Sequence, residues 1–202
     1  MELILIRHLK TPGNEKRQYI GSTEEDLSEQ EVLNFKQKYK IDSYPQVQQV
    51  IVSPMKRCIQ TAELIYPKNQ ITQEVLLKEC DFGIFEGLTY KELKGKYPQE
   101  LEQWNKEFST YRIPEGESFL DVRRRVEAFL KDIPSGEENK SEKMLITAHK
   151  GTLGHLLAAM LKLPTEGYWN FVFDQGCYSE VDLEDGYAII RKLNVRDIPR
   201  DI

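Results

Sequence analysis

The sequence predicts an α/β fold in three layers, with helices on both faces of a mostly parallel sheet that has an antiparallel edge. Short apolar runs alternate with amphipathic helical patterns along the chain, as they do in α/β proteins. Two of these runs, 2–6 and 143–147, are short and strongly apolar, which is typical of buried strands. Near the end, two strand-like segments flank Asp185-Gly186 and predict a β-hairpin.

The first apolar run leads directly into the pair Arg7-His8. Periodicity alone does not distinguish a buried strand from a buried helix here. The short length and the polar stretch 10–14 favour a strand that ends at a loop. In an open α/β sheet, ligands bind just past the carboxyl ends of the strands. We therefore expect Arg7 and His8 at the edge of the sheet where a ligand would bind.

Helices and strands alternate in the next stretch. A capping-box pattern at Ser28 opens a helix that is expected to reach about Lys40. A strand is predicted over 47–52, and the helix predicted over 54–65 has proline at its first position. A short strand over 71–75 follows.

Residues 78–116 differ in character, because aromatic and charged side chains are concentrated there. Two weak helices are expected near 89–96 and 98–108. The segment is short for an independent hydrophobic core. We interpret it as a helical insertion over the sheet, within a single domain that spans 1–202.

The last part of the chain is predicted to return to the sheet. Its expected elements, in order, are a helix over 118–130, a charged loop from Ser135, a strand over 143–147, a helix over 152–161 and hairpin strands over 177–183 and 187–193.

Composition excludes several classes of function. The net charge is −5, from 28 basic and 33 acidic residues, so a broad nucleic-acid surface is not expected. No apolar run approaches the ~20 residues that span a bilayer, and Met1 leads directly into the first strand, so neither a membrane anchor nor a signal peptide is expected. The three cysteines form no CxxC pair, which fits a reducing cytoplasm. The oligomeric state cannot be read from the sequence.

Basic side chains and histidines follow several of the predicted strands. Arg7 and His8 follow the first, Arg57 lies one helical turn after the second, and His149 follows the 143–147 strand. Helix N-termini at this edge add free N–H groups and a positive dipole end. Together these groups predict a small phosphate pocket, although Arg7 could instead pair with a surface carboxylate and His8 merely end a strand. His155, inside the last helix, is interpreted as structural.

Such a pocket suits phosphoryl transfer, which depends mostly on positioning and on stabilising the phosphoryl oxygens. Arg7, Arg57 and a protonated His149 would hold those oxygens. Unprotonated His8 would attack phosphorus, because its arginine neighbours favour the neutral imidazole. A carboxylic acid would protonate the leaving oxygen. No metal or other cofactor is required, and no cluster at metal-ligand spacing is evident.

Four blocks of sequence resemble the signature of the histidine phosphatase, or phosphoglycerate mutase-like, superfamily. They lie in order at 5–11 (LIRHLKT), 53–62 (SPMKRCIQTA), 77–87 (LKECDFGIFEG) and 148–151 (AHKG). Any one block is a weak signal, whereas four in sequence are specific. The resemblance implies the phosphoglycerate mutase-like version of the α/β fold predicted above.

The resemblance also implies roles for individual residues. It makes His8 the phosphorylated nucleophile and Glu79 the proton donor. The residues implied to bind the phosphoryl group are Arg7, Asn14, Arg57 and His149. Spacing alone does not single out Glu79, since 33 acidic residues compete for that role and a solvated carboxylate is the plain alternative.

The C-terminal part resembles the α-ribazole phosphatase branch of this superfamily. The resemblance rests on 168–171 (YWNF), 174–179 (DQGCYS) and the ending 193–196 (LNVR), together with 19–21 (YIG). The implied reaction removes the 5′-phosphate from α-ribazole 5′-phosphate, or from the phosphorylated cobamide, in cobalamin synthesis. The plain alternative is a packed terminal hairpin common to many relatives.

Two residues depart from the superfamily pattern. Leu9 stands where glycine usually follows the nucleophilic histidine, so the loop is expected to shift or the pocket to narrow. Lys150 replaces a small residue after His149 and would either add charge beside the phosphate or point to solvent. The aromatic residues proposed to stack on a heterocyclic substrate, or else to form a local core, are Tyr19, Phe82, Phe85, Trp104 and Tyr111.

The leading hypothesis is therefore a cytoplasmic, metal-independent phosphomonoesterase that acts on a small-molecule phosphate monoester. Alternatives within the class are a broad-specificity sugar-phosphate or nucleotide phosphatase and a mutase. An alternative of another class is a non-catalytic phosphate-binding protein in which Leu9 has spoiled the nucleophile's loop. A binder has no need of a proton donor such as Glu79, which argues against that reading.

Overall fold

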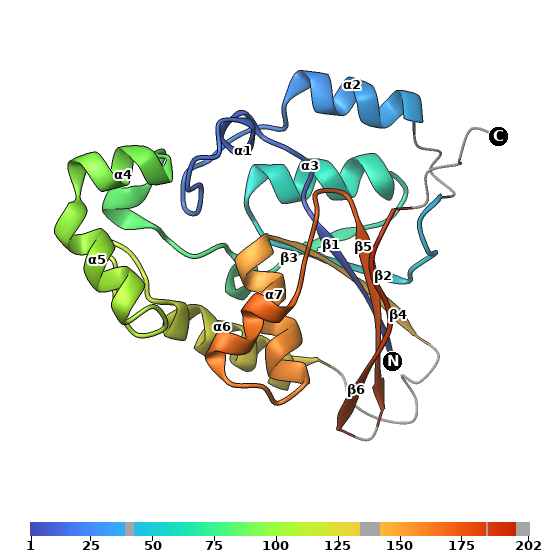
Figure 1. Cartoon of the computed structure of the whole chain (residues 1–202). Helices are drawn as coiled ribbons and strands as arrows, with labels where there is room; N and C mark the ends of the chain where they lie inside the picture. Colours follow the sequence, from blue (N-terminus) through green and yellow to red (C-terminus); the bar gives the residue numbers. More distant parts are fainter. Residues whose placement is uncertain (39–42, 134–141, 185, 197–202) are drawn as a thin grey trace.

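The computed structural model describes residues 1–38, 43–133, 142–184 and 186–196, and its centre is a six-stranded sheet (Figure 1). The strand order is β3-β2-β4-β1-β5-β6. The strands are β1 (Glu2–Arg7), β2 (Gln49–Val52), β3 (Ile71–Gln73), β4 (Lys143–Ala148), β5 (Tyr178–Glu184) and β6 (Tyr187–Val195). Strands β1 to β4 pair in parallel, whereas β5 pairs antiparallel with both β1 and β6. The predicted mostly parallel sheet with an antiparallel edge is confirmed.

Alternate residues of β1 pack against different helices, which makes the three layers. Leu3 and Leu5 belong to a core cluster with α6 (Phe119–Asp132) and α7 (Lys150–Met160). Ile4 and Ile6 belong to a second cluster with α2 (Glu29–Lys38) and α3 (Lys56–Ile65), on the other face. Because both faces of β1 are covered, its sequence is a continuous apolar run instead of an alternating one.

Two helix starts differ from the prediction for reasons of local backbone. Helix α3 begins at Lys56, not Pro54, because Met55 still has extended dihedral angles and acts as the N-cap. Helix α7 begins at Lys150, two residues earlier than expected. The predicted end of α2 at Lys40 lies outside the described residues.

Several short helical elements were not predicted, among them α1 (Pro12–Glu15), η2 (Val75–Leu77) and η5 (Thr165–Asn170). The single turn α1, expected as loop, is formed by a capping box in which Thr11 and Asn14 bond each other's backbone. The 3₁₀ turns η2 and η5 are too short to show helical periodicity. Most of the loop from Ser135 lies outside the described residues, as does Asp185 of the hairpin turn.

The segment 78–116 contains helices α4 (Tyr90–Lys96) and α5 (Pro98–Lys106) and the 3₁₀ turn η3 (Gly83–Phe85). Both predicted helices are present. The segment shares a third core cluster with Phe119 of α6 and with Tyr168. It therefore packs on the same side of the sheet as α6 and α7 and rises beside the carboxyl ends of the strands (Figure 1). The assignment of 1–202 to one domain stays a prediction. Among the described helices, none combines the length and apolar character needed to span a bilayer.

Candidate active site

The register of the sheet brings His8 and His149 together. Arg7 and Ala148 are paired in the β1–β4 ladder, and each is followed directly by one of the two histidines. The N–H of His8 donates to the carbonyl of Ala148 at 3.0 Å. The imidazole centroids are 5.1 Å apart, with the rings edge to face. The two histidines expected at one crevice therefore lie in contact at the carboxyl edge of the sheet.

The neighbours of His8 determine which ring nitrogen carries the proton. Its Nδ1 lies 2.6 Å from the carbonyl oxygen of Leu9. A carbonyl can only accept, so Nδ1 bears the proton and Nε2 keeps a free lone pair. Burial, followed by the positive charges of Arg57 and Arg7, lowers the pKa of His8 well below its usual value. Both effects favour the neutral imidazole, and the ring is in the tautomer that a nucleophile at Nε2 requires.

Leu9 does not narrow the pocket. Its side chain is buried in the cluster formed with α2 and α3, and its N–H donates to Thr61 Oγ1 at 3.0 Å. Room for this side chain comes from Gly176, where an added Cβ would lie 2.7 Å from Leu9 Cδ2. The backbone of Leu9 needs no positive φ. The narrowing expected from leucine at this position is therefore wrong, whereas the expected shift of the loop stays a prediction.

Arg57 is fully buried and bonds three elements of the site. Its Nε donates to His149 Nδ1 at 3.2 Å, and its Nη1 and Nη2 donate to the carbonyls of Thr23 and Gly21 at 2.8 and 2.7 Å. An arginine Nε can only donate, so His149 carries its proton on Nε2. That nitrogen faces Ser53 Oγ at 2.8 Å.

The sequence-based expectation of a protonated His149 is wrong, because its Nδ1 accepts from Arg57 and therefore carries no proton. Burial lowers the pKa of His149 well below its usual value, and the charge of Arg57 lowers it further. His149 is only 1% exposed, and burial of this kind cannot be read from a sequence motif. The neutral ring can still offer one N–H donor.

Two neighbours of His149 were not recognised from the sequence as members of the site. They are Ser53, which directly follows β2, and Cys58, whose Sγ lies 3.5 Å from His149 Nε2. Burial raises the pKa of the Cys58 thiol, so it stays protonated near neutrality. The position of Ser53 after a strand was the available signal, whereas nothing distinguished Cys58 from a core residue.

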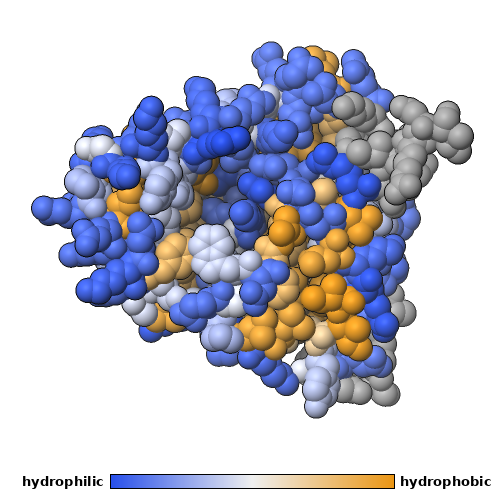
Figure 2. All heavy atoms as spheres, viewed as in Figure 1, coloured by the Kyte–Doolittle hydropathy of each residue, from blue (hydrophilic) through white to orange (hydrophobic). Residues whose placement is uncertain are grey.

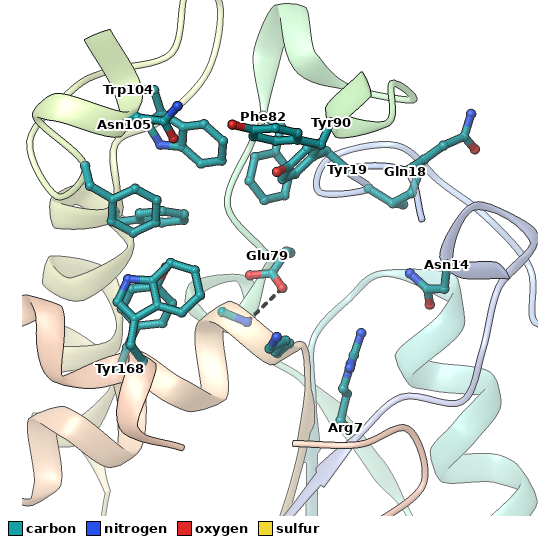
Figure 3. Close-up of a pocket in the computed structure, with 16 residues that line it drawn as sticks. Arg7, Asn14, Gln18, Tyr19, Glu79, Phe82, Tyr90, Trp104, Asn105 and Tyr168 are labelled. Carbon is teal, nitrogen blue, oxygen red and sulfur yellow. Dashed lines mark hydrogen bonds between the residues drawn. The ribbon is translucent and has the colours of Figure 1, made fainter. Parts of the chain in front are cut away.

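Arg7 and Asn14 lie on the cavity side of this cluster (Figure 3). Arg7 Nη1 donates to the carbonyl of Phe173 at 2.9 Å, and its buried Nε has no partner among the described residues. Burial lowers the pKa of Arg7, while Glu79 and Asp174 oppose that shift. Asn14 uses its Oδ1 to accept from the N–H of Thr11, which leaves its amide nitrogen for a ligand.

Glu79 enters the cavity from the opposite wall and rests on the N-terminus of α7. Its two carboxyl oxygens accept from the N–H groups of Gly151 at 3.0 Å and Thr152 at 3.2 Å, and the first of these bonds is drawn in Figure 3. An added Cβ at Gly151 would lie 2.6 Å from Glu79 Oε1. Glycine at position 151 therefore lets the carboxyl group approach the helix end. Of the six residues that the sequence predicted for the site, Arg7, Asn14 and Glu79 line the cavity. The other three, His8, Arg57 and His149, form a buried cluster joined through His149, and the charge of Arg7 acts on the pKa of both histidines.

The cavity between these walls has a volume of about 470 Å³ and an aromatic lining. It is visible in Figure 2 as a hollow between the lobe formed by α4 and α5 and the rest of the molecule. Of the five aromatic residues expected to meet a heterocycle, Tyr19, Phe82 and Trp104 line it. Phe85 is fully buried in the core and Tyr111 is not part of the lining, so both are corrected to structural positions. The further aromatic residues of the lining are Tyr90, Phe108, Phe119, Tyr168 and Trp169.

Two basic residues singled out in the sequence have different surroundings. Lys150 is exposed and lines the cavity, so it combines the two positions considered for it. His155 is outside the lining, fully buried, and stacked on Tyr168 with centroids 4.3 Å apart. Burial lowers the pKa of His155 to about 3. Within the described residues, no group of three or more histidines, cysteines or carboxylates is placed to hold a metal ion.

Comparisons with known proteins extend the resemblance to the whole chain. The family model for the histidine phosphatase superfamily (branch 1) matches residues 3–196. The adenosylcobalamin/alpha-ribazole phosphatase of Salmonella typhimurium is 28% identical over 99% of both chains. Phosphoserine phosphatase 1 of Hydrogenobacter thermophilus is also 28% identical, over 96% of this chain and 92% of its own. The crystal structure of the alpha-ribazole phosphatase from Shigella flexneri superposes with a TM-score of 0.86 at 28% identity, over 98% of both chains.

Proposed function

Because the chain belongs to the histidine phosphatase superfamily (branch 1), we propose that it removes the 5′-phosphate of α-ribazole 5′-phosphate through a phosphohistidine at His8. The observation that carries the chemistry is the neutral His8, with its Nδ1 proton held by Leu9 and its ring 5.1 Å from that of His149. The phosphatase relatives from Salmonella typhimurium and Shigella flexneri support the choice of substrate.

In the first step, Nε2 of His8 attacks phosphorus in line with the ester oxygen. A P–N bond forms and the P–O bond to the alcohol breaks. Arg7, Arg57 and Asn14 hold the phosphoryl oxygens, and the preorganised donors stabilise the charge that develops on them. Glu79, in its protonated form, gives its proton to the leaving alkoxide.

In the second step, a water molecule takes the place of the released alcohol. The Glu79 carboxylate accepts a proton from this water as its oxygen attacks phosphorus, and the P–N bond breaks. The products are inorganic phosphate and neutral His8, and Glu79 is again protonated for the next turnover. Neutral His149 contributes its Nε2–H, which Ser53 Oγ accepts at 2.8 Å in the structure.

The alcohol half of the substrate is proposed to occupy the aromatic cavity. A volume of about 470 Å³ is within the range of small-molecule sites. Aromatic walls suit a planar heterocycle, because stacked rings stabilise a bound base by about 1–3 kcal/mol. Phosphoserine offers no such ring, so the lining favours a nucleoside-like phosphate over the substrate named for the Hydrogenobacter relative. A mutase would need to keep its product in this open cavity for rephosphorylation.

A panel of phosphate monoesters tests the proposed substrate. The panel contains α-ribazole 5′-phosphate, a purine nucleoside 5′-phosphate, phosphoserine, a hexose phosphate and 3-phosphoglycerate, ranked by kcat/KM in the presence of a chelator. We expect α-ribazole 5′-phosphate to rank first and activity to survive chelation. A higher kcat/KM for phosphoserine would make phosphoserine the substrate in place of α-ribazole 5′-phosphate. Isomerisation of 3-phosphoglycerate would identify a mutase. Loss of all activity on chelation would exclude the metal-independent mechanism.

Hydrolysis of p-nitrophenyl phosphate separates an enzyme from a phosphate binder. We expect turnover by the wild-type protein and a loss of about 10⁴-fold or more in His8→Ala, as is found when a nucleophile is removed. Binding of inorganic phosphate without turnover of any ester would support the non-catalytic alternative.

A further inference from the structure

We propose that Arg125, which lies outside the aromatic cavity, positions Glu79 for proton transfer. This inference rests on the proposed role of Glu79 as the proton donor. Arg125 projects from α6 toward the segment that carries Glu79, and its guanidinium contacts that segment only through backbone carbonyls. It is therefore a positioning residue, since it touches neither the cavity nor the reacting groups.

All three nitrogens of the Arg125 guanidinium donate hydrogen bonds. Nη1 donates to the carbonyls of Leu76 and Lys78 at 2.8 and 3.0 Å, and Nη2 donates to the carbonyl of Glu79 at 3.3 Å. Nε and Nη2 each donate to Glu117 at 2.9 Å, as a bidentate pair. Five donors thus meet five acceptors, and the planar fork fixes their relative positions.

Glu117, the partner of Arg125, makes one further contact with the segment that carries Glu79. One of its carboxylate oxygens also accepts from the N–H of Asp81 at 3.1 Å, two residues beyond Glu79. The Arg125–Glu117 pair is only partly exposed, at 19% and 24% of the side chains. The pair, formed by Arg125 of α6 and by Glu117 two residues before that helix, therefore holds the backbone on both sides of Glu79.

Helix α7 holds the same segment from the other side. Thr152 Oγ1 donates to the carbonyl of Lys78 at 2.7 Å, and the N-terminal N–H groups of α7 bind the Glu79 carboxylate. Helices α6 and α7 pack against each other, so the two sets of bonds share one frame (Figure 1). Without Arg125, the side chain would keep its anchor on α7 while its backbone lost the anchor on α6.

The expected consequence is a loss that depends on the leaving group. A displaced proton donor slows the departure of a basic alkoxide and hardly affects p-nitrophenolate, which needs little protonation. A misplacement of about 1 Å can cost ~10²-fold in rate, so we expect Arg125→Met to lose about 10- to 100-fold on an alkyl phosphate. The loss on p-nitrophenyl phosphate should be under about threefold.

The experiment measures kcat/KM for a series of aryl phosphates and one alkyl phosphate. Arg125→Met should steepen the dependence of log kcat/KM on the leaving-group pKa, with the inhibition constant of inorganic phosphate unchanged. Arg125→Lys, which keeps the charge and loses the fork, should change in the same direction and serves if the methionine variant folds poorly. Arg124→Met is the matched control, because the neighbouring side chain is 68% exposed and, within the described residues, forms its ion pair with Asp121.

Glu79→Gln, alone and combined with Arg125→Met, separates the possible failures. Glu79→Gln should steepen the dependence of log kcat/KM on the leaving-group pKa. If adding Arg125→Met to this variant causes no further change, the two residues act as one unit, as proposed. If Glu79→Gln steepens the series while Arg125→Met and Arg125→Lys lower all esters equally, the positioning role is excluded and the donor assignment stands. Equal losses on all esters in Glu79→Gln would remove the donor assignment itself, and the inference with it.

Discussion

The imidazole of His8 meets that of His149 edge to face, with centroids 5.1 Å apart, at the carboxyl end of two adjacent parallel strands. The contact follows from the register, since each histidine comes one residue after the paired positions Arg7 and Ala148. The burial and the shared arginine neighbours that keep both rings neutral also isolate them from water. The positive charge of this pocket therefore comes from its buried guanidiniums and not from an imidazolium, which suits the phosphate dianion of the proposed substrate.

Ser53→Ala tests the hydrogen bond that orients His149. Without Ser53 Oγ, the Nε2–H of His149 loses its oxygen acceptor and keeps the weaker contact with Cys58 Sγ, so the ring is held less firmly. We expect kcat/KM to fall by about 5- to 10-fold, the equivalent of one hydrogen bond of roughly 1 kcal/mol or slightly more. The fall should be the same for good and poor leaving groups. Cys58→Ala is the control and should cost less, because sulfur is a weak acceptor.

Trp169→Ala tests whether the aromatic wall contacts the alcohol part of the substrate. This side chain is 59% exposed yet lines the cavity, so its removal should leave the fold intact. We expect about a tenfold rise in KM for α-ribazole 5′-phosphate, within the range reported for one stacked base. KM for a hexose phosphate should not change. An equal rise for both substrates would place the heterocycle elsewhere.

Gly176→Ala tests the space that Gly176 leaves for Leu9. The residue has φ of +70° and its new Cβ would lie 2.7 Å from Leu9 Cδ2. Gly186→Ala is the control, since its φ of +78° is similar but nothing lies within 4 Å of the new Cβ. We expect the free energy of unfolding to fall by about 1–2 kcal/mol in the control, from backbone strain alone. It should fall by at least ~1 kcal/mol more in Gly176→Ala, from overpacking. Equal losses in urea denaturation would remove the steric link to Leu9.

His155→Phe tests how a buried neutral histidine affects stability in acid. Burial lowers the pKa of His155 from 6.5 to about 3, so only the unfolded chain binds a proton there between these values. This contribution to stability is fully present above pH 6.5 and is lost as the pH falls toward 3. Between pH 6 and 4, the unfolding free energy of the wild type should fall faster than that of the variant by about 1 kcal/mol per pH unit. Parallel pH curves would show that His155 has the same pKa in the folded and unfolded states.

Much of the fold could be predicted because its signals are local. The apolar run of β1, the helix start at Ser118 and the pairing of the hairpin strands β5 and β6 each depend on residues close together in the sequence, and each formed as expected. Short 3₁₀ segments such as η5 escaped prediction, because six residues are too few to repeat a hydrophobic pattern.

The site was predicted less completely, because much of it depends on contacts distant in sequence. Glu79 was identified from its motif, not from spacing, and its seat on the α7 N-terminus joins positions more than 70 residues apart. The protonation of His149 was predicted wrongly, since burial cannot be read from a motif. Arg125 lies in a stretch of three arginines on α6, and nothing in the sequence distinguishes it from its exposed neighbour Arg124.

Rapid-quench labelling with a ³²P-labelled phosphate monoester tests the phosphohistidine mechanism most directly. We predict that label appears within one turnover, is stable in base and labile in acid, maps to the peptide that contains His8, and is absent in His8→Ala. Label on a serine, an aspartate or a different histidine, or turnover of the ester by His8→Ala at the wild-type rate, would contradict nucleophilic attack by His8.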